Sequence, residues 1–302
     1  MGQILINAGC FVGIILLGIF LRWIGFFKES DFQVLSKIAV KVTLPAAVVV
    51  SFSNAQLDPG LLVISALGLG CGVVYIAVAF LTNLRADKEK RAFDVLNLPG
   101  YNIGLFAMPF ISGFLGAAGA VTTSLFDTGN ACVCLGGAYG VADGIKSGSK
   151  FSVGRVVKAL LTSVPFVAYV IMIILRLLGW SLPAPVLQFA DVIKGASTFV
   201  AMLMIGVGFK ISVNREQIGH ILKIVGLRYL VATAIALAFW FLLPFELKVR
   251  QALVLLAFAP IGAATPAFTG MLKLDAGMSS TINSICIVCS ITIMTTLLTI
   301  ML

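Results

Sequence analysis

Apolar residues occur in long runs along nearly the whole chain, and charged residues or Pro and Gly separate one run from the next. A run of about 20 apolar residues is enough to cross a bilayer as a helix. In the first half we expect such helices at Gln3–Arg22, Val34–Ser53, Leu61–Leu81, Ala92–Phe110 and Gly116–Val141. In the second half we expect them at Val156–Leu178, Val186–Phe209, Gln217–Leu243, Arg250–Leu272 and Gly277–Met301. The pattern predicts an all-α membrane protein with ten transmembrane helices.

Composition supports a protein that lies almost entirely within the membrane. Of the 302 residues, 60% are hydrophobic and only 11% are charged, whereas soluble domains carry roughly 25% charged residues. No polar interval is long enough for a soluble domain, so residues 1–302 are expected to form one membrane domain. The net charge of +9 is spread over short loops, which is typical of a multi-pass protein of the cell membrane, inner or plasma, and predicts no nucleic-acid partner.

The distribution of Lys and Arg predicts the orientation, because these residues collect in cytoplasmic loops. With the N-terminus outside, the predicted inner loops contain Lys28, Arg85, Lys88, Lys90, Arg91, Lys146, Lys150, Arg155, Lys210, Arg215 and Lys273. Only Arg176, Lys248 and Arg250 lie near the predicted outer side. We therefore expect both termini outside.

The two halves of the chain show signs of an internal repeat. A shift of 157 residues superposes Trp23 on Trp180, Lys37 on Lys194 and Pro109 on Pro266. Residues 1–145 and 146–302 would then be two five-helix repeats, and an odd number of helices places the second upside down relative to the first. Inverted repeats are typical of secondary transporters, whose substrate site lies near the midplane where the halves meet.

The fourth and ninth helices carry matching prolines, Pro99 and Pro109 in the fourth and Pro260 and Pro266 in the ninth. Each proline removes a backbone donor and clashes with the preceding turn. Broken backbone inside a membrane is tolerated where it is buried in protein or lines a cavity. The matching breaks therefore indicate a binding site, although ordinary proline kinks would give the same pattern.

Four short motifs spread over the chain resemble the auxin efflux carrier family. They are Leu44-Pro45-Ala46-Ala47, Asn102-x-Gly104 followed by Pro109, Asp127-x-x-Asn130, and Ala259-Pro260 to Ala267. The resemblance implies a fold distantly shared with bile-acid symporters, in which helices four and nine cross at unwound segments. It also implies a scaffold of helices 1, 2, 6 and 7, dimerisation through that scaffold, and a moving transport part of helices 3–5 and 8–10.

Two departures from relatives limit the choice of substrate and coupling ion. The Asn-Pro-Asn-Thr-Tyr stretch of the plant carriers is not kept, so auxin itself is not expected. Sodium-coupled relatives use an acidic residue near the second crossing, and Arg250–Leu272 contains no Asp or Glu. A proton is therefore favoured over sodium as the coupling ion.

Asp127 is the main candidate for chemistry, because it lies about 16 Å into the fifth helix at 1.5 Å per residue. A carboxylate at that depth costs several kcal/mol and indicates a proton or cation site, unless it is only a hydrogen-bonded structural residue. Asn130 follows on the same helix face. The residues expected to bind substrate are Asn97, Tyr101, Asn102, Gly104, Asn130 and Thr265.

Four charged residues are candidates for attracting anions into the two vestibules: Lys37, Lys41, Asp191 and Lys194. The alternative is that Lys37 and Lys41 extend to the membrane surface and that Lys194 pairs locally with Asp191.

The six cysteines lie within apolar runs, and no histidine accompanies Cys132-x-Cys134 or Cys286-x-x-Cys289. We expect neither a metal nor another cofactor. No catalytic cluster of nucleophile and base is visible, so an enzyme is not expected. The sequence predicts a secondary active transporter for a small organic anion, working by elevator-type alternating access. The alternatives are a sodium-coupled symporter of bile-acid type and a non-pumping channel or sensor.

Overall fold

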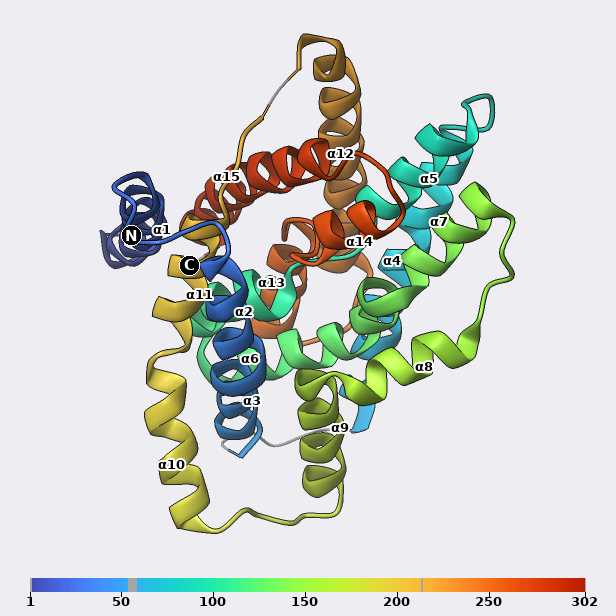
Figure 1. Cartoon of the computed structure of the whole chain (residues 1–302). Helices are drawn as coiled ribbons and strands as arrows, with labels where there is room; N and C mark the ends of the chain where they lie inside the picture. Colours follow the sequence, from blue (N-terminus) through green and yellow to red (C-terminus); the bar gives the residue numbers. More distant parts are fainter. Residues whose placement is uncertain (1, 54–58, 213, 302) are drawn as a thin grey trace.

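The computed structural model describes residues 2–53, 59–212 and 214–301 (Figure 1), which form helices and connecting segments with no β-strand among them. Seven of the described stretches are long and apolar enough to cross a membrane. They are Leu5–Trp23, Asp31–Ser53, Pro59–Leu81, Ile103–Ser147, Ala184–Gly208, Arg215–Leu242 and Ala276–Met301. The all-α membrane class is therefore confirmed, whereas ten spans and an inverted repeat stay predictions.

In its described residues, the first half of the chain forms seven α-helices, and three single π-helical turns connect or precede some of them. The α-helices are α1 (Gly2–Trp23), α2 (Asp31–Ile38), α3 (Leu44–Ser53), α4 (Val63–Leu81), α5 (Lys88–Asn97), α6 (Met108–Cys132) and α7 (Ala138–Ser147). The π turns, at Ala39–Thr43, Ile103–Ala107 and Val133–Gly137, join α2 to α3, precede α6, and join α6 to α7. A π turn widens the helix locally and is frequent at functional sites.

The fourth and fifth expected segments meet inside α6 at Gly116. Its φ of 62° and ψ of −146° are not helical, and glycine adopts such a positive φ without a Cβ clash. Two helical pieces therefore lie within the 45 residues of Ile103–Ser147. The second piece runs on through α7, six residues beyond the end expected at Val141.

The second half contains α8 (Val153–Thr162), α9 (Val164–Leu177), α10 (Ala184–Gly195), α11 (Ser197–Gly208), α12 (Ile218–Leu242), α13 (Leu247–Ala257), α14 (Thr265–Met271) and α15 (Ala276–Met301). The sixth expected segment is not straight, because α8 and α9 meet at 79°. Ser163 between them is extended and Pro165 lies in the first turn of α9. Proline cannot continue the preceding helix but fits a first turn. The bent pair would make an eighth span.

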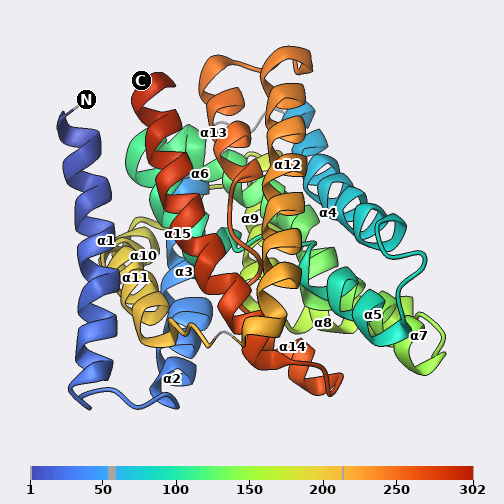
Figure 2. The same ribbon diagram turned by 90° about the horizontal axis from the view of Figure 1, so that it is seen from above.

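The start of α1 and the end of α15 lie near one another in both views (Figures 1 and 2). The connections that follow α1, α7 and α14 lie in the lower half of Figure 2, whereas both ends lie at its upper edge. Figure 1 shows α13 in the middle of the bundle, and its residues from Gln251 to Ala257 are buried.

Large apolar side chains cover the outside of the peripheral helices. Trp23 of α1 is 81% exposed, Leu230 of α12 is 68% exposed, and Val73 of α4 is 53% exposed. Soluble monomers rarely expose contiguous apolar surface on this scale. These faces suit lipid tails and support a multi-pass membrane protein.

Close backbone contacts between helices depend on glycine. A Cβ on Gly129 of α6 would lie 1.7 Å from the carbonyl oxygen of Ser65, and one on Gly68 of α4 would lie 2.1 Å from that of Phe126. Helices α1 and α11 make the same kind of contact through Gly18 and Gly206. Small residues at such contacts let membrane helices pack through close van der Waals approach.

Replacing Gly129 by Ala should therefore destabilise the protein by about 1–3 kcal/mol, the usual range for overpacking a rigid contact. The measurement is the midpoint of thermal unfolding in detergent. Gly70→Ala on α4 is the control, because a Cβ there meets nothing within 4 Å. Equal stability of the two variants would contradict this account of the contact between α4 and α6.

Candidate functional site

Two helical stretches, one in each half of the chain, are interrupted, and the two interruptions contact each other in the folded protein. Helix α5 ends at Asn97 and the chain becomes helical again at Ile103, while α13 ends at Ala257 and α14 begins at Thr265. The backbone N–H of Asn102 in the first interruption donates to the carbonyl oxygen of Pro260 in the second, at 2.8 Å. We call these two unwound segments, residues 98–102 and 258–264, the crossing.

The sequence explains why both helices stop here. Pro99 and Pro260 lie inside the unwound segments and have no N–H to donate. Gly100 has a φ of 77°, which lies in the left-handed region that glycine adopts readily. Pro266 lies in the first turn of α14, where a missing N–H is not needed. Pro109 lies at the start of α6, directly after the π turn Ile103–Ala107. Pro266 thus marks a helix start, Pro109 marks the change from the π turn to α6, and Pro99 and Pro260 mark the interruptions.

Arg228 of α12 satisfies the carbonyl groups that the interruptions leave without helical partners. Its guanidinium donates to the oxygen of Leu98 at 2.6 Å, of Gly100 at 2.9 Å and of Ala259 at 2.7 Å, so it bonds to both unwound segments. The side chain is 1% exposed. Each carbonyl left without a partner inside a membrane would cost several kcal/mol.

Two tyrosine rings enclose the same guanidinium. The rings of Tyr75 and Tyr101 each have their centroid 5.2 Å from its central carbon, which is within the range of a cation–π interaction. Arg228 is not among the site residues expected from the sequence. An arginine near the start of the otherwise uncharged run from Ile224 to Leu242 is the signal that could have identified it.

Asp127 and Asn130 lie one turn apart on α6 and face the crossing from the other side. Asn130 accepts from the N–H of Tyr101 and donates to its carbonyl oxygen, each at 3.0 Å, and it also donates to Asp127 at 2.8 Å. The second oxygen of Asp127 accepts from the hydroxyl of Tyr169 on α9 at 2.9 Å. Tyr169 was also missed, because nothing in the sequence links a tyrosine of α9 to a residue of α6.

A cavity of about 390 Å³ opens beside the crossing. We call it the crossing cavity. Five of the expected substrate-binding residues line it, together with Asp127 and Tyr169. The five are Tyr101, Asn102, Gly104, Asn130 and Thr265. The volume suits a small organic molecule.

The sixth expected substrate-binding residue, Asn97, is fully buried in a separate polar network. It donates to Thr269 of α14 at 3.2 Å and accepts from Ser279 of α15. It does not line the crossing cavity. Its position fits a residue that joins α5 to α14 and α15 better than one that touches a ligand.

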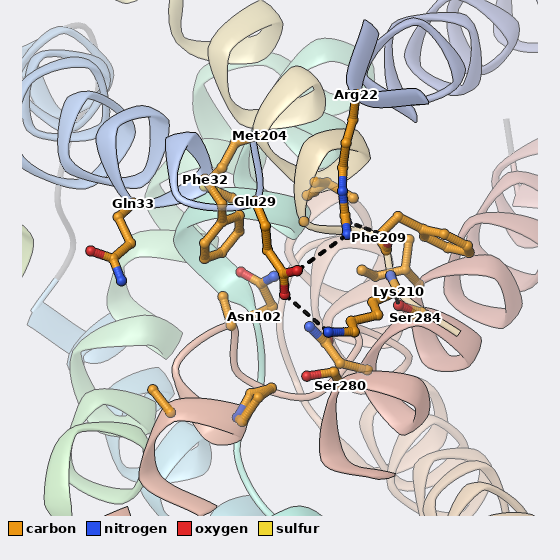
Figure 3. Close-up of a pocket in the computed structure, with 17 residues that line it drawn as sticks. Arg22, Glu29, Phe32, Gln33, Asn102, Met204, Phe209, Lys210, Ser280 and Ser284 are labelled. Atoms are coloured by element: carbon orange, nitrogen blue, oxygen red, sulfur yellow. Dashed lines mark hydrogen bonds and ion pairs between the residues drawn. The ribbon is translucent and has the colours of Figure 1, made fainter. Parts of the chain in front are cut away.

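A second cavity of about 340 Å³, the vestibule, shares Phe32, Asn102, Ala263 and Ala267 with the crossing cavity. Its charged residues are Arg22, Glu29 and Lys210, and Pro266 also lines it. Figure 3 shows the Glu29 carboxylate reaching toward both Arg22 and Lys210. The nitrogen–oxygen distances are 3.6 Å and 3.0 Å.

The hydrogen bond from Lys210 and its charge, with a smaller contribution from Arg22, hold the pKa of Glu29 below its ordinary value of 4.5. Glu29 therefore stays ionised at neutral pH and neutralises part of the positive charge at the vestibule. The pair is largely exposed, with 67% of the Glu29 side chain accessible, so its contribution to stability is small.

A third cavity of about 700 Å³, the distal cavity, contains Pro109, Asp191 and Lys194 in its lining. Asp191 and Lys194 form an ion pair at 3.5 Å. The two prolines that a shift of 157 residues superposes thus line different cavities, Pro109 the distal cavity and Pro266 the vestibule. Lys37 and Lys41 are exposed on α2 and its π turn and line neither the vestibule nor the crossing cavity.

Among the described residues, no three His, Cys, Asp or Glu side chains gather as a metal site would require. The cysteines of the two spaced pairs are free thiols. Cys134 lines the crossing cavity and its thiol lies 3.3 Å from the side-chain oxygen of Asn130.

The structure defines a multi-pass α-helical membrane protein with two interrupted helices that meet beside a polar cavity. No protein-family model matches the chain, and no curated protein matches its sequence. The function must therefore be argued from the crossing itself.

Gly104 limits the width of the crossing cavity. A Cβ built on it would lie 2.5 Å from the end of the Leu44 side chain and 3.6 Å from Asp127. Gly104→Ala should fold, because Leu44 can turn aside, but it should narrow the cavity. We expect a small methanethiosulfonate reagent to modify Cys134 about tenfold more slowly, a difference of ~1.4 kcal/mol. Peptide mass spectrometry measures this rate, Gly70→Ala is the control, and an unchanged rate would refute the geometry.

Proposed function

We propose that the protein is a secondary active transporter for a small organic anion, built from ten spans in two inverted five-helix repeats. The observation that carries the proposal is the meeting of two interrupted helices, one from each half of the chain, beside a cavity that holds Asp127. Interrupted helices that meet in this way form the substrate sites of many secondary transporters. The resemblance to auxin efflux carriers points to the same class.

Several features of the crossing cavity favour an anion. The helical piece that begins at Ile103 turns its N-terminus toward the cavity, since Ile103, Gly104 and Leu105 all line it. The N–H groups of a helix N-terminus lack helical partners and attract negative charge. Asn102 begins this piece without capping it through its side chain. Its amide is therefore available to a carboxylate group of the substrate.

The arrangement of cavities supports alternating access. The vestibule and the distal cavity each contain one of the two superposed prolines, as expected for two halves of opposite orientation. We assign the first, second, sixth and seventh expected spans to a scaffold that forms a homodimer, and the other spans to a part that carries the crossing from one side to the other. The bond from Tyr169 of α9 to Asp127 of α6 would then join scaffold and moving part.

The orientation is part of the proposal. Both termini would lie outside, because the connections rich in Lys and Arg belong on the cytoplasmic side. The vestibule, with Arg22 and Lys210, would then open to the cytoplasm. The proposed location is the cell membrane.

Transport into proteoliposomes tests this function. Radiolabelled lactate, succinate and malate are offered with and without an imposed pH gradient. A transporter coupled to protons accumulates its substrate above the outside concentration when the inside is alkaline. A channel only equalises concentrations, and a sensor moves none. Dependence on a sodium gradient instead would favour the bile-acid type of symporter.

Asp127→Asn should abolish accumulation driven by the pH gradient while exchange of internal for external substrate continues. Asn keeps the size and hydrogen bonding of Asp but cannot release a proton. We expect the accumulation ratio to fall about tenfold or more, equal to at least ~1.4 kcal/mol of coupling. Asp87→Asn makes the same chemical change at the exposed N-cap of α5, where Asn caps as well as Asp, and should leave accumulation intact. Undiminished accumulation in the Asp127 variant would rule out its role in coupling.

Pro109→Ala and Pro266→Ala should impair transport more than folding. Alanine in place of Pro266 supplies an N–H at the start of α14 and lets that helix extend backward into the unwound segment. Alanine in place of Pro109 supplies an N–H that can regularise the π turn between the crossing and α6. We expect transport to fall about tenfold with little change in melting temperature. Pro185→Ala, an exposed proline in the first turn of α10, is the control. If both variants transport at the wild-type rate, the crossing is not the moving substrate site.

A further inference from the structure

Arg228 is a buried cation with no carboxylate beside it. In the part of the chain that the structure describes, none of the ion pairs includes Arg228. Its hydrogen bonds go to neutral carbonyl groups and its ring contacts go to tyrosines. Hydrogen bonds satisfy its N–H groups but do not cancel its charge. A buried charge without a counter-charge is costly inside a membrane.

A continuous chain of hydrogen bonds connects this cation to Asp127. Arg228 donates to the oxygen of Gly100, and the N–H of the same peptide unit, at Tyr101, donates to the side-chain oxygen of Asn130. The amide nitrogen of Asn130 then donates to Asp127. The three distances are 2.9, 3.0 and 2.8 Å.

Every donor in this chain points from the cation toward the carboxylate. The oxygen and the N–H of one trans peptide unit lie on opposite sides of it, so the dipoles of the peptide and of Asn130 are aligned. Aligned hydrogen bonds polarise and strengthen one another in a medium of low dielectric constant. The arrangement therefore stabilises Asp127 in its ionised form.

Few other groups compete for this role. Tyr101, Tyr169 and Cys134 face Asp127 from the crossing, α9 and the π turn after α6, and all three are ordinarily neutral at pH 7. Ser36 and Leu44 also line the cavity, but the charged residues between them do not. These are Lys37 of α2 and Lys41 of the following π turn, and both are exposed. Among the described residues that line the crossing cavity, Asp127 alone carries a formal charge at that pH.

We propose that Arg228 is the counter-charge of Asp127 and that the pair couples one proton to one negative charge of the transported anion. The proposal rests on the proposed transport function. An empty site is neutral when Asp127 is ionised, and a site holding a monoanion is neutral when Asp127 has taken a proton from water. Both other combinations carry one net charge across the membrane.

The coupling follows from the free energy of moving charge through lipid. A moving part with a net buried charge crosses the membrane at a cost that a neutral one does not have. The site therefore moves either empty and ionised, or loaded and protonated. By linkage, binding of the anion favours binding of the proton and binding of the proton favours binding of the anion.

Infrared spectroscopy of the purified, substrate-free protein tests the pair. A protonated carboxylic acid has a C=O stretching band that a carboxylate lacks. At pH 7 the spectra of wild type and Asp127→Asn should not differ in this band, because Asp127 is ionised in wild type. Arg228→Gln should show the band, because proton affinity at Asp127 rises about 5- to 150-fold, the usual range of coupling between two sites. The band should disappear in the double variant Arg228→Gln/Asp127→Asn.

Two further variants separate charge from architecture. Arg228→Lys keeps the charge but replaces the planar fork of donors by a compact ammonium group, so it should resemble wild type in the infrared. Arg250→Gln removes an arginine that also stacks on a tryptophan, Trp240, and bonds to its carbonyl oxygen, and it should leave Asp127 ionised. If Arg228→Gln also leaves Asp127 ionised, or if wild type already holds the proton, the proposal is wrong.

The sign of a stability change provides a measurement that needs no Arg228 variant. A buried carboxylate without a counter-charge is destabilising, so its replacement by Asn would raise the melting temperature. Paired with Arg228, Asp127 stabilises the fold. Asp127→Asn should therefore lower the melting temperature at pH 7, whereas Asp191→Asn should leave it nearly unchanged. A higher melting temperature of Asp127→Asn would overturn the pairing.

Exchange of radiolabelled lactate, a monoanion, tests the coupling. Asp127→Asn and the double variant Arg228→Lys/Asp127→Asn are neutral when loaded and should exchange lactate, whereas Arg228→Gln and Arg228→Gln/Asp127→Asn should lose at least about nine-tenths of the rate. Exchange by the Gln variants at the wild-type rate would contradict the charge rule. If wild type exchanges no lactate, the transport function fails for this anion, and the infrared comparison still decides the pair.

Discussion

The three hydrogen bonds from Arg228 to the carbonyl oxygens of Leu98, Gly100 and Ala259 are the contacts on which the centre of this structure depends. Lipid offers no water to the backbone groups that an interrupted helix exposes, so another part of the protein must satisfy them. One guanidinium does this for both interruptions at once. Because it bonds to residues on either side of the crossing, the two unwound segments are held together, and a cavity can open beside them without loss of the fold.

The rest of the bundle supports this arrangement by packing closely around it. Gly68 and Gly129 bring α4 and α6 into backbone contact, which places Asp127 and Asn130 of α6 against the crossing. The Asn97 network joins α5 to α14 and α15 on the other side. The polar groups of the crossing are therefore held by rigid helices, and this rigidity suits a site that must keep its geometry while its surroundings change.

Much of the crossing could be predicted because its causes are local. Pro99 and Pro260 break any helix through their missing N–H groups, and the three-residue spacing of Asp127 and Asn130 places both on one helix face. Other features have no local cause. The hydrogen bond from Tyr169 to Asp127 joins residues that lie 42 positions apart in the chain, on α9 and α6. The burial of Asn97 away from the cavity follows from how α14 and α15 pack. Arg228 stands out in the sequence as a charge in an apolar helix, but its partners do not.

The sequence by itself determined the all-helical membrane class, the places where two helices break, and the presence of a carboxylate deep in the fifth apolar run. These properties follow from hydropathy, backbone chemistry and helix periodicity, which act over a few residues. Only the tertiary structure decided that the two breaks touch, that one arginine satisfies both, and that a directed chain of hydrogen bonds connects this arginine to Asp127. Those contacts join α12 to the unwound segments after α5 and α13 and, through Asn130, to α6. The physical reason is that buried polar groups must find partners wherever packing brings them within reach.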